Sequence, residues 1–263
     1  MDYSISSRAA SLAPSLTLAI SAKAKELRAR GEDVIGLGAG EPDFDTPQHI
    51  KDAAAQALAD GFTKYTPSSG IPELRQAVAD KFQRDYGVAY EPSQIIVSCG
   101  GKHSCFNVIY ATCEAGDEVI IPAPYWLSYP EMAKLAGAKP VILDTTDKTE
   151  FKVTSEQLRE AITPNTKLLV SESPTNPHLS VVDLERFAAL GKRHGVQTLI
   201  DATLATPCNM RPLETGIDYV LHSATKYLGG HSDVLGGALV VRDPDRSGIK
   251  NISGLRIYIV FLS

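Results

Sequence analysis

A lysine flanked by two hydroxyl side chains stands near the end of the chain and suggests covalent chemistry. Ser223, Thr225 and Lys226 follow an apolar stretch and precede a glycine-rich segment. A lysine amine can condense with an aldehyde, and hydroxyl groups suit the phosphate of an aldehyde cofactor such as pyridoxal phosphate. Asp201 follows the apolar residues 198–200, so we expect its carboxylate at the carboxyl end of a strand, where open α/β sheets bind ligands. The plainer alternatives are a surface lysine and a loop-capping aspartate.

These side chains must be positioned by a fold in which strands and helices alternate. Short apolar runs typical of buried strands are separated by segments with helical spacing, and this order predicts a three-layer α/β fold with a mostly parallel sheet. The expected helices cover residues 17–30, 47–59, a segment from about 72, a segment through 106 and 108, a segment near 129, and 182–194. The expected strands cover residues 34–37, 95–97, 119–121, 140–143, 168–170, 198–200, 219–221 and 238–241.

Composition and charge exclude several classes of protein. The chain has 263 residues, of which 43% are hydrophobic and 22% charged, as in a protein with a packed core. A net charge of −5 without a basic stripe argues against a nucleic-acid partner, and no apolar run is long enough to cross a membrane. The start lacks a secretory pattern. None of the four cysteines forms a C-x-x-C pair, which argues against a zinc ribbon or a redox dithiol. We therefore expect a cytoplasmic protein with reduced thiols.

Four motifs in the first two-thirds of the chain resemble those of bacterial class I aspartate aminotransferases. The similarity covers residues 14–169, and the matching motifs are AGEPDFDTP from residue 39, KYTPSSGIPELR from 64, GGKHSCFN from 100 and PYWLSYPEM from 124. The resemblance implies a fold-type I enzyme with pyridoxal 5′-phosphate as cofactor, and it implies amino-acid and 2-oxo-acid substrates.

The aminotransferase resemblance also implies roles for individual residues. Gly101 and Lys102 would lie at the cofactor phosphate, at the start of a helix, and Trp126 would stack on the cofactor ring. Tyr65 would reach the phosphate of the cofactor in a partner subunit, which implies a homodimer. The residues expected near the substrate carboxylates are Gly40, Thr17 and Lys102.

The last third of the chain, residues 172–241, resembles the cystathionine γ-synthase and γ-lyase family, which has the same fold. By that resemblance Lys226 forms the Schiff base and acts in catalysis together with Asp201, which would pair with the pyridine nitrogen. Ser223 and Thr225 would contact the phosphate. The residue that fits both families is Asn176, in ESPTNP, which would bond to the ring hydroxyl.

The chain departs from the usual aminotransferase pattern at two places. The family usually has Asn-Pro-Thr-Gly where this chain has His178 and Leu179 after Asn176 and Pro177. The family also has Asp-x-x-Tyr at the pyridine partner, where this chain has Leu204. The environment of the ring nitrogen is therefore expected to follow the second family.

We expect three parts in the chain: an N-terminal arm with part of a small domain in residues 1–45, a cofactor-binding large domain in 46–245, and an unmatched tail in 246–263. Both families continue well beyond residue 263, so most of the small domain is expected to be missing, along with the arginine that grips the substrate α-carboxylate. Arg256 lies in the tail, and nothing aligns it with that role.

The favoured function is transfer of an amino group from an acidic amino acid to a 2-oxo acid. The alternatives are β- or γ-elimination or replacement on sulfur amino acids, and an inactive remnant. A nicotinamide-binding dehydrogenase is set aside because Glu41 replaces the last glycine of G-x-G-x-x-G. No metal site is expected, because His103, His222 and His231 match no common ligand spacing.

Overall fold

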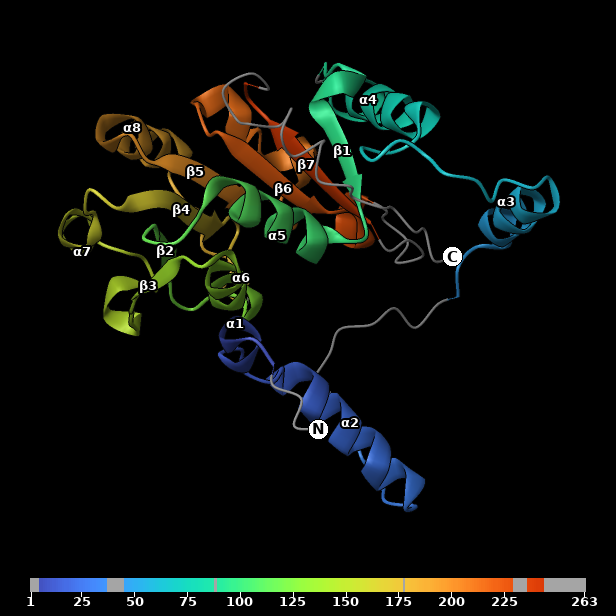
Figure 1. Cartoon of the computed structure of the whole chain (residues 1–263), viewed down its shortest axis with the longest axis horizontal. Coiled ribbons are helices and arrows are strands. Elements are labelled where there is room, and N and C mark those ends of the chain that lie inside the picture. The colour runs from blue at the N-terminus through green and yellow to red at the C-terminus, as the bar shows by residue number, and fades with distance from the viewer. Residues whose placement is uncertain (1–4, 37–44, 88, 177, 229–235, 244–263) are drawn as a thin grey trace.

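The computed structural model contains a seven-stranded sheet flanked by helices on both faces (Figure 1). It describes residues 5–36, 45–87, 89–176, 178–228 and 236–243. The strand order is β1-β7-β6-β5-β4-β2-β3, and only β7 runs antiparallel to its neighbours. The strands are β1 Ile95–Ser98, β2 Glu118–Pro122, β3 Lys139–Leu143, β4 Thr166–Glu172, β5 Gln197–Asp201, β6 Tyr219–Ser223 and β7 Gly237–Val241.

The helices are interleaved with these strands along the chain. They are α1 Ser7–Ala10, α2 Leu16–Ala29, α3 Gln48–Ala59, α4 Pro72–Tyr86, α5 Gly101–Thr112, α6 Ser128–Ala136, α7 Ser155–Ala161, α8 Leu184–His194 and α9 Thr206–Asn209. Three short 3₁₀ helices are η1 Pro92–Gln94, η2 Asp147–Thr149 and η3 Pro212–Thr215, and η4 Ala224–Leu228 is a single π-helical turn. The prediction of an α/β fold with a mostly parallel sheet is confirmed.

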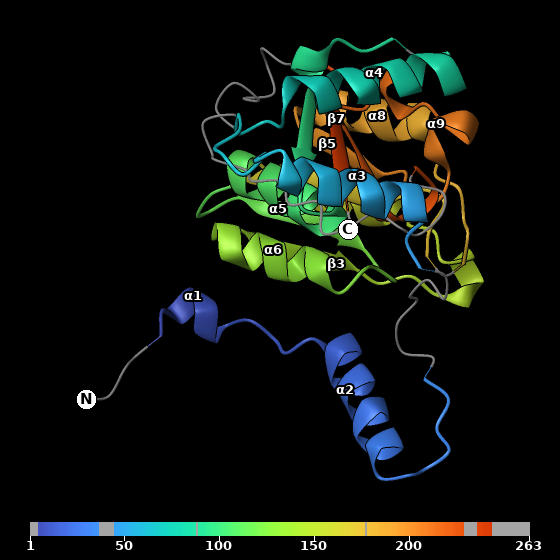
Figure 2. The same cartoon turned by 90° about the vertical axis from the view of Figure 1, so that its right-hand side faces the viewer.

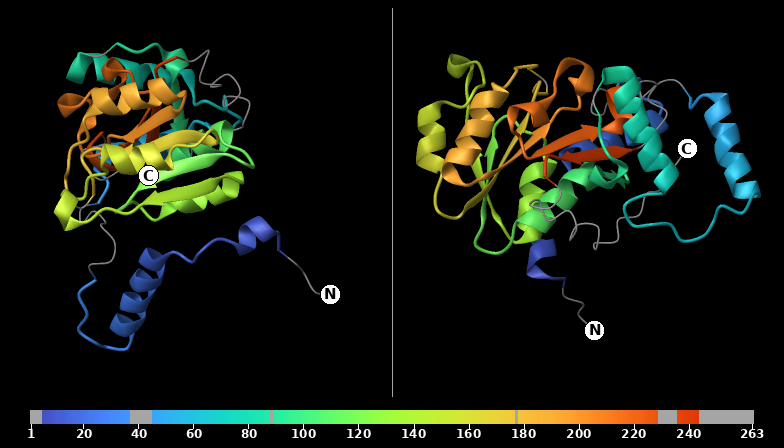
Figure 3. Two further views of the ribbon diagram at one scale, coloured as in Figure 1. Left: turned by 90° about the vertical axis from the view of Figure 1, so that its left-hand side faces the viewer. Right: turned by 90° about the horizontal axis from the view of Figure 1, so that it is seen from above.

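Both faces of the sheet are covered, which explains why its strands read as continuous apolar runs. On one face, α5 and α6 pack over β-strand residues such as Val119, Leu168 and Leu199. On the other face, α8 and α7 cover Ile200 and Leu169 with their own apolar side chains, and α4 packs against β1. Figures 2 and 3 show the same layers from the sides and from above.

Helices α1, α2 and α3 have no buried residue. In Figures 1 and 2, α2 projects away from the sheet, and α3 lies at the outer end of the molecule beyond α4. The segment between α1 and α2 is tied to α6 by one hydrogen bond, 3.1 Å long, from the Ala13 amide to Glu131 Oε2. The N-terminal helices therefore contribute little to the core of this chain.

The strand expected at residues 34–37 is wrong for residues 34–36, which form no strand, and Leu37 lies outside the described residues. A strand needs a neighbouring strand to satisfy its backbone groups. Here the Val34 carbonyl instead accepts a hydrogen bond from Arg28 Nε, 2.9 Å away. Residues 34–36 thus fold back against the end of α2 through this hydrogen bond.

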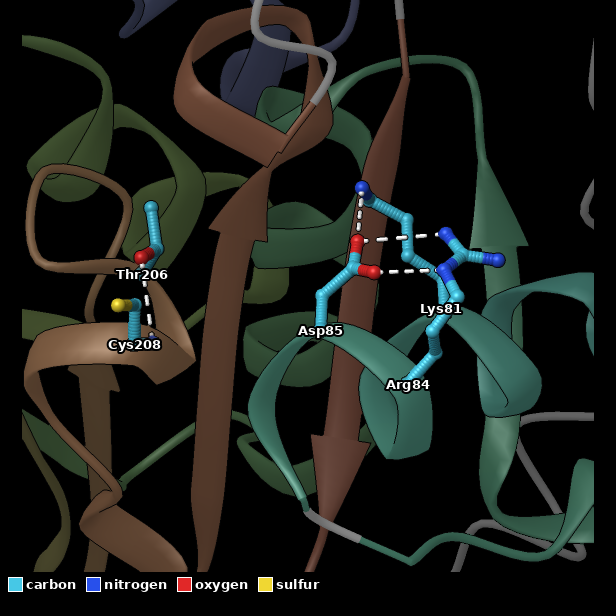
Figure 4. A network of polar contacts seen from close by, with 5 residues as sticks. All are labelled: Lys81, Arg84, Asp85, Thr206 and Cys208. Carbon is cyan, nitrogen blue, oxygen red and sulfur yellow. Dashed lines mark hydrogen bonds and ion pairs between the residues drawn. The ribbon is translucent and has the colours of Figure 1, made fainter.

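The polar side chains at the end of α4 form an exposed cluster (Figure 4). Asp85 accepts hydrogen bonds from Lys81 Nζ and Arg84 Nε, each at 2.7 Å. On neighbouring α9, the Cys208 amide donates to Thr206 Oγ1 over 3.3 Å. Exposed ion pairs contribute little to stability, so we assign this cluster at the end of α4 no larger role.

No helix within the described residues is long and apolar enough to span a membrane. The cytoplasmic location stays a prediction, as do the three parts expected from the sequence. The tail from residue 246, with Arg256, lies outside the described residues.

Candidate functional site

Six strands run in the same direction, so their carboxyl ends meet at one edge of the sheet. At that edge Glu172 of β4 pairs in register with Asp201 of β5, and Ser223 ends β6. Side chains alternate between the faces of a strand. The residues two positions earlier all pack under α5 and α6, namely Val170, Leu199 and Leu221. Glu172, Asp201 and Ser223 therefore share one face.

The carboxylate of Asp201 is buried, with 8% of the residue exposed, and is held by three hydrogen bonds. Its Oδ1 atom accepts from the Thr203 amide at 3.0 Å and from Thr203 Oγ1 at 2.5 Å. Its Oδ2 atom accepts from the Tyr129 hydroxyl at 3.1 Å. Burial raises the pKa of Asp201, while the bonds from Thr203 and Tyr129 act in the opposite direction. The fixed carboxylate is suited to a cationic hydrogen-bond donor.

Aromatic rings lie next to this carboxylate. Trp126, in the loop before α6, meets Tyr129 edge-on, with ring centroids 5.4 Å apart and planes at 86°. The ammonium of Lys102 lies 5.2 Å from the centroid of the Trp126 ring, a distance at which a cation is attracted to the ring face. The expected platform residue and the expected phosphate residue thus contact each other.

The start of α5 packs tightly against the end of β6. A Cβ atom on Gly101 would lie 2.9 Å from Ser223 Cβ and 3.0 Å from Ser223 Cα, so only glycine fits without a backbone shift. Gly100 precedes the helix with a φ of 92°, a conformation that favours glycine. Gly237 approaches so closely that its Cβ would lie 2.5 Å from the Gly100 carbonyl. The free amides of the first turn of α5 thus lie beside Ser223, an arrangement that attracts anions.

Lys226 lies in η4, directly after β6, with a non-helical backbone (φ −96°, ψ −121°) and an exposed side chain. Within the described residues it forms no ion pair. The hydroxyl of Thr225 is engaged with the backbone of Gly236: it accepts from the amide at 3.0 Å and donates to the carbonyl at 3.3 Å. Thr225 therefore fastens the turn that carries Lys226 to the chain entering β7.

Asn176 is exposed and lies just past the end of β4. Its backbone amide donates a hydrogen bond to Glu172 Oε2 over 3.3 Å. Glu172 and Tyr129 both line a cleft of about 670 Å³ that runs from this edge between the sheet, α7 and α8. Burial, followed by the charge of Asp201, raises the pKa of Glu172 to about 7, and the Asn176 amide lowers it.

Two of the three other expected residues, Thr17 and Tyr65, are not brought to this edge. Thr17 is exposed on α2, and Tyr65 is 96% exposed in the segment between α3 and α4. Gly40 lies outside the described residues.

Sequence reasoning missed Tyr129, Thr203 and Glu172 as members of the site. Thr203 follows Asp201 by two residues, a spacing at which an aspartate often accepts a hydrogen bond from the backbone, so it could have been found. Glu172 ends an apolar run and could have been found by the argument used for Asp201. Tyr129 gives no local signal, because it is 72 residues away from Asp201 in sequence.

Within the described residues, no group of three or more His, Cys, Asp or Glu side chains could hold a metal ion. His222 is buried on the opposite face of β6, where burial lowers its pKa to about 4. Burial also lowers the pKa of the half-buried His103. His231 lies outside the described residues.

The residues at this edge fit a phosphate-bearing pyridine aldehyde. Asp201 offers a buried carboxylate, and the start of α5 offers unpaired amides next to Ser223. Two buried hydroxyls, of Ser98 and Ser104, have no hydrogen-bond partner within the described residues, and Ser98 ends β1 close to this helix start. Lys226 adds an exposed amine. The carboxylate, the amides with their neighbouring hydroxyls, and the amine thus match the ring nitrogen, the phosphate and the aldehyde of pyridoxal phosphate, respectively.

Residues 32–225 match the model of the aminotransferase class I and II family. Among curated proteins, the chain is 52% identical over 200 residues to an aspartate aminotransferase of Geobacillus stearothermophilus, covering 75% of this chain and 51% of the relative. It is 53% identical over 187 residues to an aspartate/prephenate aminotransferase of Nitrosomonas europaea, covering 71% of this chain and 47% of the relative. The chain thus spans about half the length of the curated relatives it matches.

The structure is similar to that of an aspartate aminotransferase from Thermus thermophilus solved with maleate. The TM-score is 0.83 and the identity 39%, over 97% of this chain and 68% of the other. The separate resemblance of residues 172–241 to the cystathionine enzymes stays an interpretation of the sequence.

Proposed function

The chain belongs to the aminotransferase class I and II family, and from that premise we propose that it forms the cofactor-binding part of a pyridoxal 5′-phosphate enzyme that transfers an amino group from an acidic amino acid to a 2-oxo acid. The names of its relatives support the aspartate-type substrate. The observation that carries the proposal is the buried carboxylate of Asp201 at the same sheet edge as the start of α5 and the lysine turn of η4.

The residues of the site have separate proposed tasks, and Lys226 has two. When bound, pyridoxal phosphate supplies the aldehyde carbon that receives the amino group and a ring that delocalises the electron pair of the substrate. Lys226 Nζ would hold the cofactor through its aldehyde carbon, and as a free amine it would serve as the general base for the substrate α-proton. Asp201 keeps a proton on the ring nitrogen, because a carboxylate beside a cation favours the charged form. Asn176 bonds to the ring hydroxyl, and Trp126 covers a ring face.

The phosphate is proposed to bind at the start of α5. The amides of Gly101 and Lys102 point out of the first helical turn, where the helix dipole favours an anion. Ser223 adds a hydroxyl beside Gly101, since a Cβ atom built on that glycine would lie 3.3 Å from Ser223 Oγ. Thr225 contributes by fixing the turn and, on binding, with its own hydroxyl.

The substrate and partner contacts are proposed from the resemblance to the aminotransferases. Lys102 and Thr17 would receive the distal carboxylate of the substrate, and Gly40 would lie near the substrate carboxylate. Tyr65 would reach the phosphate bound by the second subunit of a homodimer. The division into an arm (1–45), a large domain (46–245) and a tail (246–263) completes the proposal, with the reaction taking place in the cytoplasm.

The proposal is tested by borohydride reduction of the 263-residue chain after incubation with pyridoxal phosphate. Peptide mass mapping should find the reduced cofactor on the peptide that contains Lys226. A Lys226→Ala variant should carry none on that peptide, whereas a Lys139→Ala variant, which lacks an exposed lysine at the start of β3, should be labelled like the wild type. Labelling spread over many surface lysines, equal in both variants, would contradict the site.

Elimination on sulfur amino acids is the second candidate, favoured by His178 and Leu179 in place of Thr-Gly and by Leu204 in place of a tyrosine. The two reactions differ in their products. Transamination needs a 2-oxo acid acceptor and releases no ammonia, whereas elimination releases ammonia without an acceptor. Assays with aspartate plus 2-oxoglutarate, and with cystathionine alone, therefore separate them.

A further inference from the structure

Glu172 is a second carboxyl group in the candidate site, and neither resemblance drawn from the sequence gives it a role. It ends β4 in register with Asp201 at the end of β5. The two side chains share the face covered by α5 and α6, because the residues two positions before them pack in the same apolar cluster. Two carboxyl groups on adjacent strand ends and the same face cannot both ionise without repulsion.

Glu172 is also linked to the residue expected at the ring hydroxyl. Its Oε2 atom accepts the amide of Asn176 at 3.3 Å. The Glu172 side chain therefore neighbours both Asp201, the expected partner of the ring nitrogen, and Asn176, the expected partner of the ring hydroxyl. A change of charge on Glu172 would act on both positions.

We propose that Glu172 is a positioning residue of the cofactor site, which holds the backbone of Asn176, carries a proton in the ligand-free protein, and gives that proton up when a positively charged ring nitrogen binds beside Asp201. This inference rests on the proposed function, since it concerns the same cofactor pocket. It adds an acid that couples cofactor binding to one proton.

The groups around Glu172 explain why it holds a proton. Burial and the charge of Asp201 raise the pKa of Glu172 to about 7, and only the Asn176 amide acts against them. Burial also raises the pKa values of Tyr129 on α6 and Cys105 on α5, so both stay neutral near this pH. The basic groups on the walls of the shared cleft are Lys152, Arg159, Arg186, Arg193 and His194.

A bound pyridinium reverses this balance, because a nearby cation favours the charged carboxylate and lowers the pKa of Glu172. A ligand that lowers the pKa of an acid binds its ionised form more tightly. Affinity should therefore rise as the pH rises toward about 7, the pKa of Glu172 in the ligand-free protein, and then level off. The slope is at most one proton, or about tenfold in affinity per pH unit.

The test is the affinity of the full chain for pyridoxine 5′-phosphate between pH 6 and 8. This probe has the ring nitrogen, hydroxyl and phosphate but no aldehyde, so it does not react with lysines. Binding is followed by the fluorescence of Trp126, the only tryptophan of the chain. From pH 6 to 7 the wild type should gain up to about tenfold in affinity relative to Glu172→Gln. The glutamine side chain keeps an oxygen that accepts from the Asn176 backbone amide, but it cannot titrate. Glu172→Ala, which loses that acceptor too, should bind more weakly at every pH.

A matched ligand isolates the ring nitrogen. With the analogue in which that nitrogen is replaced by carbon, the wild type and Glu172→Gln should show the same pH dependence. If the Gln variant does not fold, calorimetry of the wild type in two buffers of different ionisation enthalpy decides the question. Near pH 6.5, the nitrogen ligand should release up to about one more proton than the carbon analogue.

Equal pH dependence of the wild type and the Gln variant toward the nitrogen ligand, or equal proton release with the two ligands, would overturn the role of Glu172. Lys226 labelling by borohydride would still stand in that case. Absence of binding by any protein at any pH would instead overturn the cofactor site and, with it, this role.

Discussion

The hydroxyl of Tyr129 helps to keep Asp201 ionised, because its hydrogen bond to Oδ2 lowers the pKa of that buried carboxylate. Tyr129→Phe leaves the two bonds from Thr203 in place and retains a ring against Trp126. A hydrogen bond to a charged group is worth about 1.5–3 kcal/mol, so the affinity for pyridoxal phosphate should fall at least about tenfold. Titration of Trp126 fluorescence measures it.

The control for this variant is Tyr110→Phe, which removes a hydroxyl from a tyrosine at the far end of α5 that stacks on Phe106. Its affinity for the cofactor should equal that of the wild type. Unchanged affinity in Tyr129→Phe would mean that Thr203 alone sets the state of Asp201.

Glu172 should make the stability of the ligand-free chain depend on pH. Its pKa is about 7 in the folded protein, against 4.5 ordinarily. A group with a raised folded pKa stabilises the fold fully below its unfolded pKa, and this contribution is lost as the pH rises through the folded pKa. Between pH 4.5 and 7 the wild type should lose Tm relative to Glu172→Gln, by about 2–4 °C for each kcal/mol. Scanning calorimetry at several pH values tests this, and a constant difference in Tm would contradict it.

At the scale of single residues, the sequence points to side chains that follow an apolar strand. Asp201 and Ser223 could be placed because the end of a parallel strand lies at the ligand-binding edge. Tyr129 could not, because its contact with Asp201 depends on how α6 lies across the sheet. Thr225 was identified as a phosphate residue, yet its hydroxyl fastens Gly236, a contact that exists only once β7 has formed.

At the scale of elements, the junction between α5, β6 and β7 is the most closely packed part of the site. In Gly101→Ala, the new Cβ would lie 2.9 Å from Ser223 Cβ and 3.0 Å from Ser223 Cα, so the helix start must move away from the strand. Such overpacking costs about 1–3 kcal/mol. We expect a lower Tm and, because the phosphate amides move, a loss of affinity for pyridoxal phosphate.

Gly191→Ala separates the two effects. Gly191 lies on α8, away from the start of α5. A Cβ atom on it would lie 2.6 Å from Thr198 Cγ2 and 2.7 Å from the Val196 carbonyl. It should lower Tm as Gly101→Ala does while leaving cofactor affinity unchanged. Equal affinity losses in the two variants would mean that stability, not phosphate geometry, controls binding.

The elements themselves were predictable where a buried strand or an amphipathic helix is long. The apolar runs at β2, β4, β5 and β6 were identified, because a strand covered on both faces must be apolar throughout. The seven-residue helix α7 was missed, although Thr154 and Gln157 form a capping box at its start, a sequence signal for a helix. The order of strands in the sheet could not be read from the sequence, since it follows from long-range pairing.

At the scale of the whole molecule, the described chain has a covered sheet but uncovered N-terminal helices. The α2 helix has no buried residue. Its apolar side chains Leu16 and Ile20, four residues apart and therefore on one side of the helix, are 63% and 56% exposed. The chain also spans about half the length of its curated relatives. The family match and the sheet therefore support a cofactor site at the carboxyl edge of the sheet.

The proposed homodimer gives a prediction that links assembly to the site. If Tyr65, which is 96% exposed, donates to the phosphate bound by the partner, cofactor affinity should increase with protein concentration as dimers form. In Tyr65→Phe this dependence should weaken, with a loss of at least about tenfold at high concentration, because a hydrogen bond to a charged phosphate is removed. Sedimentation velocity gives the mass at each concentration, and the Tyr110→Phe variant serves again as the control. A chain that stays monomeric and binds the cofactor equally well with and without the Tyr65 hydroxyl would mean that one subunit builds the phosphate site alone.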